Sequence, residues 1–121
     1  MKKVILVADD SATIRKFVSF SLNVRGYDII SVSDGMEALE KLPQNNVDLI
    51  ITDLNMPNVD GFELIKKIRS NEEYADIPII ILSSLSSQDE VSKGLSAGAN
   101  SYLIKPFDPN RILYEVSKYL N

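Results

Sequence analysis

The sequence alternates five times between a short apolar run and a segment whose apolar residues recur at intervals of three and four. The apolar runs span residues 3–8, 27–33, 48–53, 77–83 and 101–105. Runs of this length that are rich in β-branched residues are typical of buried strands, and the intervals of three and four are typical of amphipathic helices. Because neighbouring parallel strands need a crossover connection, strict alternation predicts an α/β domain with helices on both faces of a parallel sheet.

The composition of the runs also predicts the order of the strands. The first, third and fourth runs are nearly continuous in apolar residues, as strands covered on both faces are. The second and fifth runs contain aspartate, serine and lysine, and we therefore expect them at the edges. The flavodoxin-like order 2-1-3-4-5, a doubly wound five-stranded sheet with five helices, satisfies this expectation.

Local signals mark the ends of the predicted helices. An aspartate or serine that precedes a glutamate by three residues is typical of a capping box, and a proline after an N-cap residue is typical of a first helical position. The expected N-caps are Asp34, Asp60, Ser87 and Asp108, and the expected stops are Gly26 and Gly98. The apolar positions expected to face the sheet are Ile14, Phe17, Val18 and Leu22, then Met36, Leu39 and Leu42, then Leu64, Ile65 and Ile68, then Val91 and Leu95, and finally Ile112, Leu113, Val116 and Leu120.

Length and composition limit the classes of protein that are possible. A chain of 121 residues suits one domain, which we expect to span residues 1–121. There is no cysteine and no histidine, which excludes disulfides, thiolate metal sites and histidine chemistry within this chain. The net charge of −4 argues against nucleic acid as a ligand. The first apolar run is too short for a signal peptide or a membrane span, so we expect a cytoplasmic protein with no membrane partner.

Five polar residues stand where the predicted strands end. Asp9 and Asp10 follow the first run, Asp53 ends the third, Ser83 the fourth and Lys105 the fifth. Functional groups of open α/β sheets gather at this edge, so the three carboxylates should converge there. At ~7 Å and an effective dielectric constant of ~20, each pair would repel by roughly 2 kcal/mol.

A divalent cation would relieve this repulsion, and carboxylate oxygens with waters and a backbone carbonyl suit Mg²⁺. The ammonium group of Lys105 would add a second positive charge, and Ser83 would add a hydroxyl donor. Such a cradle suits phosphoryl oxygens, because phosphoryl transfer needs mainly positioning and charge neutralisation. Asp53 would then be the nucleophile, as carboxylates are in aspartyl-phosphate chemistry.

Taken together and in order, these motifs resemble the receiver domains of two-component response regulators, most nearly the single-domain chemotaxis type. The matching pieces are VADD (7–10), ITDLNMPNVDG (51–61), ILSS (81–84), AGA (97–99) and LIKPF (103–107). The resemblance implies the following roles: Asp53 as phosphoacceptor, Asp9 and Asp10 as the acidic pair for Mg²⁺, Asn55 as a metal ligand through its carbonyl, Lys105 as the phosphate-binding lysine, and Ser83 and Tyr102 as the switch residues. Two departures are Ser83, where threonine is commoner, and Ala8, where a larger apolar residue is commoner.

The resemblance also implies a function and partners. A receiver accepts a phosphoryl group from a sensor histidine kinase or a histidine phosphotransfer protein, and then signals to an output protein. It is a switch that catalyses only its own phosphorylation and dephosphorylation, and it acts as a monomer or as a phosphorylation-dependent dimer. We expect the output surface on the fourth helix, the fifth strand and the fifth helix, within residues 86–119. The sequence names neither the kinase nor the target.

Two other classes of function remain open. A phosphatase of the haloacid dehalogenase type also uses a strand-end aspartate and Mg²⁺, but it carries DxD after an early strand, whereas Asn55 stands third here. A flavodoxin-like nucleotide or flavin binder needs a phosphate loop after the first strand, where this chain has two carboxylates. Taken singly, the polar residues have ordinary interpretations, such as a turn residue for Asp53, a solvated edge lysine for Lys105 or packing for Tyr102.

Overall fold

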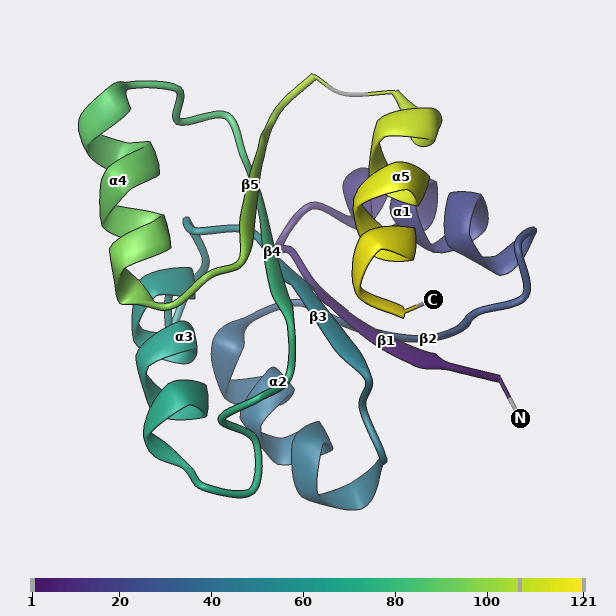
Figure 1. Cartoon of the computed structure of the whole chain (residues 1–121), viewed down its shortest axis with the longest axis horizontal. Coiled ribbons are helices and arrows are strands. Elements are labelled where there is room, and N and C mark those ends of the chain that lie inside the picture. Colours follow the sequence, from purple (N-terminus) through teal and green to yellow (C-terminus); the bar gives the residue numbers. More distant parts are fainter. Residues whose placement is uncertain (1, 107, 121) are drawn as a thin grey trace.

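A computed structural model describes residues 2–106 and 108–120 as three layers around one parallel sheet (Figure 1). The strands are β1 (Val4–Ala8), β2 (Asp28–Val32), β3 (Leu49–Thr52), β4 (Ile79–Ser83) and β5 (Ser101–Ile104). Their order is β2-β1-β3-β4-β5, and every neighbouring pair is parallel, which confirms the predicted topology. Met1, Phe107 of the LIKPF motif and Asn121 lie outside the described residues.

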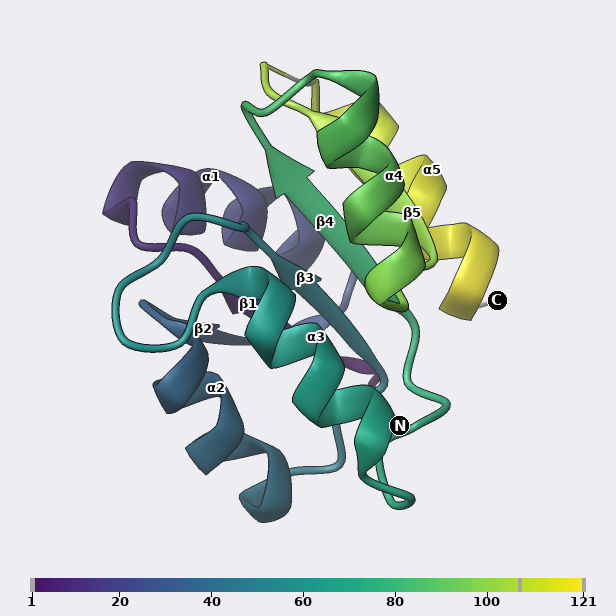
Figure 2. The same cartoon turned by 90° about the vertical axis from the view of Figure 1, so that its left-hand side faces the viewer.

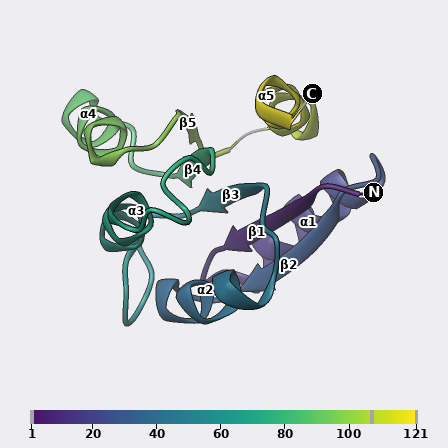
Figure 3. The same ribbon diagram turned by 60° about the horizontal axis from the view of Figure 1, so that its bottom comes forward.

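Five α-helices cover the sheet on both faces. They are α1 (Ala12–Asn23), α2 (Gly35–Lys41), α3 (Gly61–Ser70), α4 (Gln88–Ala97) and α5 (Pro109–Leu120), with a 3₁₀ turn, η1 (Leu42–Gln44), after α2. Helices α1 and α5 lie on one face, and α2, α3 and α4 lie on the other (Figures 2 and 3). No helix within the described residues is long and apolar enough to cross a membrane.

Alternating strand residues feed two separate cores, one on each face. In β1, Ile5 and Val7 point to the core under α1 and α5, whereas Leu6 and Ala8 point to the core under α2 and α3. This period of two is that of a strand with both faces covered. The sheet is therefore held from both sides, and the carboxyl ends of the strands are fixed relative to one another.

The predicted helix starts are confirmed by side-chain hydrogen bonds. The side chains of Asp34, Asp60 and Ser87 each accept a hydrogen bond from the backbone N–H three residues on. Asp108 accepts one from the backbone N–H of Arg111, and α5 begins at Pro109. The C-cap residue of α4 is Gly98, as predicted, and its φ of 124° is a conformation that glycine adopts at low energetic cost.

The structure corrects several expected core positions and boundaries. Met36 is 50% exposed, Leu95 43% and Phe17 39%. Smaller residues of the same helices are buried instead: Ala38 in α2, Gly94 in α4, and Ser21 beside Val18 and Leu22 in α1. The strands are also shorter than predicted by one or two residues at an end, so Asp53 and Lys105 lie just beyond them.

Arg69, near the end of α3, joins two loops at the amino ends of the strands: the loop between α3 and β4 and the loop between α4 and β5. Its guanidinium group donates to the carbonyl oxygens of Gly98 (2.9 Å), Ala75 (2.9 Å) and Ile77 (2.7 Å). It also donates to the side chain of Asn100 at 2.9 Å. The end of α4 and the start of β5 are thereby fixed to α3.

Replacing Arg69 by lysine should destabilise the fold, because an ammonium group cannot reproduce this fork of donors. Loss of two or more hydrogen bonds to a charged group predicts a decrease of about 2 kcal/mol or more in the free energy of unfolding, measured by urea denaturation. The matched control is Arg25→Lys at an exposed position, which should change stability by less than about 0.5 kcal/mol. Equal effects of the two substitutions on the free energy of unfolding would contradict a stabilising role for the hydrogen bonds of Arg69.

Candidate functional site

The site begins with the register of two neighbouring strands. Ala8 of β1 pairs with Thr52 of β3, so the next residues, Asp9 and Asp53, leave the sheet side by side. The backbone N–H of Asp53 donates to the carbonyl of Ala8 at 2.9 Å, and that of Asp9 donates to the carbonyl of Val32 at 3.1 Å. Backbone pairing thus continues to the aspartates and fixes where their side chains start.

Three carboxylates meet at this point, as the sequence predicts. Asp9 and Asp53 are buried, with 2% and 8% of their surface exposed, and Asp10 is exposed. One oxygen from each lies within 4.8 Å of the others. At that distance and an effective dielectric constant of ~20, each pair repels by at least roughly 3 kcal/mol, so the cluster requires cations.

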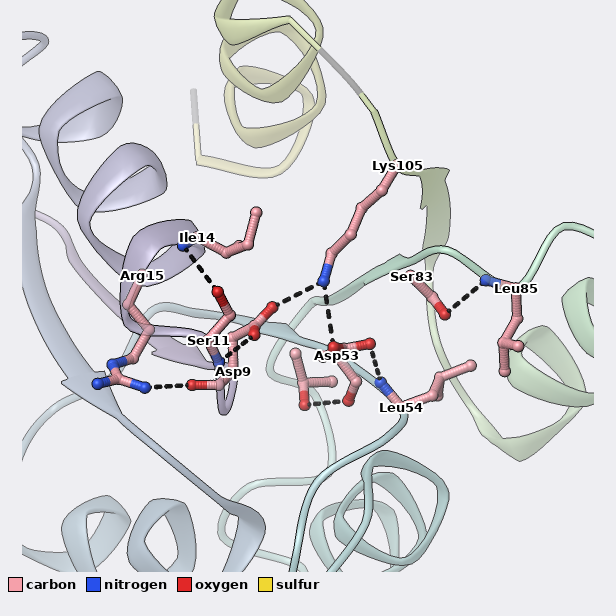
Figure 4. Close-up of polar contacts among 10 residues, drawn as sticks. Asp9, Ser11, Ile14, Arg15, Asp53, Leu54, Ser83, Leu85 and Lys105 are labelled. Carbon is pink, nitrogen blue, oxygen red and sulfur yellow. Dashed lines mark hydrogen bonds and ion pairs between the residues drawn. The ribbon is translucent and has the colours of Figure 1, made fainter.

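Lys105 supplies one cation. Its Nζ lies 3.0 Å from Oδ2 of Asp9 and 3.1 Å from Oδ2 of Asp53, and it reaches down between them from the end of β5 (Figure 4). Its backbone N–H donates to the carbonyl of Ser83 at 2.8 Å, which holds the lysine beside the end of β4. One ammonium group against three carboxylates leaves an excess of negative charge.

The ionisation of Asp53 and Lys105 reflects this burial and pairing. Burial raises the pKa of Asp53 above its ordinary value, and the attraction of Lys105 only partly offsets it. Burial acts to lower the pKa of Lys105, but hydrogen bonding to Asp9 and the charge of Asp53 outweigh it, so the pKa of Lys105 is raised. Lys105 therefore keeps its proton, while Asp53 carries its charge at a cost.

The start of α1 holds Asp9 in place, through residues that the sequence analysis missed. The backbone N–H of Ser11 donates to Oδ1 of Asp9 at 2.8 Å, and Arg15 Nη1 donates to the carbonyl of Asp9 at 2.6 Å. Ser11 also caps α1 by accepting a hydrogen bond from the N–H of Ile14 at 3.3 Å. The sequence signal was present, since a serine directly before a helical stripe is typical of an N-cap.

The loop after Asp53 folds back closely on itself. Oδ1 of Asp53 accepts a hydrogen bond from the N–H of Leu54 at 2.7 Å, and the N–H of Gly61 donates to the carbonyl of Leu54 at 2.9 Å. A Cβ on Gly61 would lie 2.2 Å from the carbonyl oxygen of Asp53, so only glycine permits this approach. Asn55 is exposed within this loop, directly after Leu54.

The donor set fits a hard divalent cation. Carboxylate oxygens dominate it, nitrogen and sulfur ligands are absent because the chain has no histidine or cysteine, and the charge remaining after Lys105 is negative. These properties favour Mg²⁺ over softer metals. Asp9, Asp10 and Asp53 can hold such an ion, whereas a contribution from the carbonyl of Asn55 stays a prediction.

Ser83 and Tyr102 meet at a shared neighbour. Ser83 is fully buried, and its Oγ accepts a hydrogen bond from the N–H of Leu85 at 3.1 Å. The Tyr102 hydroxyl donates to the carbonyl of the same Leu85 at 2.7 Å. The peptide groups of one loop residue therefore connect the serine at the end of β4 to the half-buried ring on β5.

Comparison with known families decides which family the chain belongs to. Residues 5–117 match the family described as the response regulator receiver domain. The chain belongs to this family. Receiver domains are signalling switches of two-component systems. The match covers every strand except the first residue of β1, Val4, and Asp9, Asp53 and Lys105 lie within it.

Individual receivers are similar over nearly the whole chain. The chemotaxis protein CheY1 of Helicobacter pylori is 42% identical over 107 residues, which are 87% of this chain and 86% of that protein. A chemotaxis protein CheY homolog of Campylobacter jejuni is 41% identical over 107 residues, 87% of this chain and 82% of that one. The crystal structure of the chemotaxis response regulator CheY4 of Vibrio cholerae superposes with a TM-score of 0.92 at 36% identity, covering 98% of this chain and 99% of that one.

Removing the charge of Asp53 from this receiver should stabilise it in the absence of Mg²⁺. The pKa of Asp53 is raised above 3.8, so the folded state binds the proton more tightly than the unfolded state. Stability contributed by this group is therefore present below pH 3.8 and is lost as the pH rises through the folded pKa. Asp53→Asn should raise the melting temperature at pH 7, by on the order of 4 °C for each kcal/mol of repulsion removed, and have little effect near pH 3.

Thermal denaturation in a chelating buffer measures this difference. The matched control is Glu40→Gln, which removes a negative charge from an exposed position outside the cluster and should leave the melting temperature nearly unchanged at both pH values. A gain from Asp53→Asn that is the same at pH 3 and pH 7 would show that ionisation of Asp53 does not cost stability.

Proposed function

We propose that this receiver accepts a phosphoryl group on Asp53 from the phosphohistidine of a sensor kinase or a histidine phosphotransfer protein, in a Mg²⁺-dependent reaction in the cytoplasm. The observation that carries the proposal is the position of Lys105, whose ammonium group bridges Asp9 and Asp53 inside the carboxylate cluster. The chain contains no histidine, so the phosphohistidine belongs to another protein segment.

The chemical step needs little beyond positioning and charge neutralisation. An oxygen of Asp53 attacks the phosphorus, the bond from phosphorus to the donor nitrogen breaks, and imidazole leaves. Lys105 neutralises charge on the transferred group, and the hydroxyl of Ser83 donates to one of its oxygens. Bound Mg²⁺ supplies further positive charge for the phosphoryl oxygens, and Asp9, Asp10 and Asp53, with the carbonyl of Asn55, are its proposed ligands.

A hollow beside Lys105 offers a path for the donor. It has a volume of about 320 Å³, and its lining residues are Ile14, Phe17, Ser84, Lys105 and Pro106. The lining comes from the start of α1 and from the segments that follow β4 and β5, so it opens at the same end of the sheet as the carboxylates. Lys105 is the residue that this hollow shares with the carboxylate cluster.

The first test of the proposed function is autophosphorylation by acetyl phosphate in the presence of Mg²⁺. Intact-mass spectrometry should show one added phosphoryl group, and Asp53→Ala should abolish it. Asp10→Asn should raise the Mg²⁺ concentration needed for phosphorylation and reduce the stabilisation that Mg²⁺ gives by mass action. A phosphoryl group that persists in Asp53→Ala would refute the assignment, and multiple turnover of phosphate monoesters would instead favour a phosphatase.

The proposed output step starts at Ser83. When Ser83 turns its hydroxyl toward a phosphoryl oxygen on Asp53, it gives up its hydrogen bond to Leu85, and Leu85 also carries the hydrogen bond from Tyr102. The loop, the Tyr102 ring and α4 then change their balance between two arrangements. We place the output protein, or a second copy in a phosphorylation-dependent dimer, on α4, β5 and α5 within residues 86–119.

Ser83→Ala separates phosphorylation from signalling. Because Asp53, Lys105 and the metal ligands are unchanged, the variant should still accept a phosphoryl group from acetyl phosphate. The reaction should be slower, since the hydroxyl donor of Ser83 is missing. It should transmit poorly, so phosphorylation should move the amide signals of residues 88–104 much less than in the parent. The control is Ser86→Ala, at an exposed position in the same loop. Phosphorylation shifts in the parent that stay within the Asp53 pocket would contradict the switch.

A further inference from the structure

Helix α4 rests on the sheet through one small residue. Of its ten residues, Gly94 is the buried one, whereas Leu95 is 43% exposed and Val91 is half-buried. Glycine is disfavoured in a helix interior, because it adds flexibility and buries no side chain. A helix-weakening residue at the point of closest contact indicates that space is needed there.

The space beside Gly94 is filled by Tyr102. A Cβ built on Gly94 would lie 3.2 Å from both Cδ2 and Cε2 of the Tyr102 ring and 2.7 Å from Cδ1 of Ile81. The ring therefore lies in a slot whose one wall is the backbone of α4 at Gly94. At the far end of the slot, the Tyr102 hydroxyl donates to the carbonyl of Leu85.

Tyr102 also borders a second space. A hollow of about 400 Å³ opens along β5, and its lining residues are Tyr102, Leu103, Ile104, Pro106, Asp108 and Arg111. The half-buried Tyr102 therefore contacts α4 at Gly94 and also borders an open hollow along the edge strand β5. Rotation of one side chain would move it from the first space to the second.

We propose that Gly94 is the positioning residue that keeps the Tyr102 ring inward, and thereby sets the balance of the signalling switch. This inference rests on the proposed function for the meaning of the switch, but the slot itself is a property of the unphosphorylated protein. A methyl group at residue 94 would meet the end of the Ile81 side chain at 2.7 Å and the Tyr102 ring at 3.2 Å, so these side chains shift, with the ring moving toward the hollow, or α4 moves away from β4.

Contacts on both sides of Gly94 oppose movement of α4. Lys93 Nζ lies 4.2 Å from the centroid of the Phe62 ring on α3, a cation–π contact. Arg69 holds the carbonyl of Gly98 at the end of the helix. Because α4 is attached to α3 at these two places, we expect the side chains beneath it to move rather than the helix, and the Tyr102 ring borders a hollow into which it can move when it leaves the Leu85 carbonyl.

The test is Gly94→Ala with tyrosines labelled for NMR. The chain has five tyrosines, and the Tyr102 signal is assigned with Tyr102→Phe. In the free protein, Gly94→Ala should shift the Tyr102 ring signal toward that of the exposed Tyr114 and remove the protection of its hydroxyl. With saturating beryllofluoride and Mg²⁺ as a phosphoryl mimic, amides near Asp53 should still respond, whereas those of Leu85 and Tyr102 should lose most of their response.

Two further variants show whether the methyl acts through this contact. Ser96→Ala, at an exposed position of the same helix, should leave the Tyr102 signal unchanged. Ile81→Val removes the Cδ1 atom nearest the new methyl group, so Ile81→Val combined with Gly94→Ala should restore part of the parental Tyr102 signal, and it also keeps the test possible if Gly94→Ala alone folds poorly.

The outcomes separate this inference from the proposed function. The role of Gly94 would be overturned if the Tyr102 signal of free Gly94→Ala equals the parental signal, whatever the mimic does. If only the double variant folds, the same comparison is made with that variant. An outward shift of the ring in the free variant supports the role, even if the parent shows no response to beryllofluoride. In that last case the proposed phosphorylation function fails, and Gly94 remains the residue that positions Tyr102.

Discussion

The contact between the Lys105 ammonium group and two buried carboxylates is the interaction on which the site depends. It joins the ends of β1, β3 and β5, three strands that are far apart in the sequence, through distances of 3.0 and 3.1 Å. Without a cation there, Asp9 and Asp53 would be two buried charges of the same sign, which is strongly unfavourable. The sheet order is therefore as much an electrostatic requirement as a consequence of apolar packing.

Much of this arrangement was predictable from the sequence, for physical reasons that differ between elements. The strand order followed from composition, because doubly covered strands such as β3 are nearly continuous in apolar residues whereas edge strands tolerate Asp28 or Ser101. The convergence of Asp9, Asp53 and Lys105 followed from the rule that parallel strands end at one edge. The N-caps followed from the need of first-turn N–H groups for acceptors.

Other features were not predictable, because they depend on distances rather than on residue types. A helical stripe cannot tell which of its members faces the sheet, so Met36 and Leu95 were assigned to the core although the smaller Ala38 and Gly94 lie there. The anchoring of Asp9 by Ser11 and Arg15 depends on how α1 is oriented relative to β1. Leu85 connects Ser83 and Tyr102 through its backbone N–H and carbonyl groups. Because almost every residue carries these groups, the sequence gives no signal for this connection.

The sparse burial of α4 has a consequence for how the molecule opens. Helices α3 and α5 each bury several side chains in a core, whereas α4 buries Gly94. The free energy needed to detach a helix scales with the apolar surface that it covers, so α4 should open at a lower free energy than α3 or α5. Its backbone amides should exchange with deuterated solvent through local opening, well before those of β1 and β3 exchange through global unfolding. A partner that binds α4 would therefore slow the hydrogen exchange of the amides in that helix. Exchange of the amides at the carboxylate end of the sheet would stay unchanged.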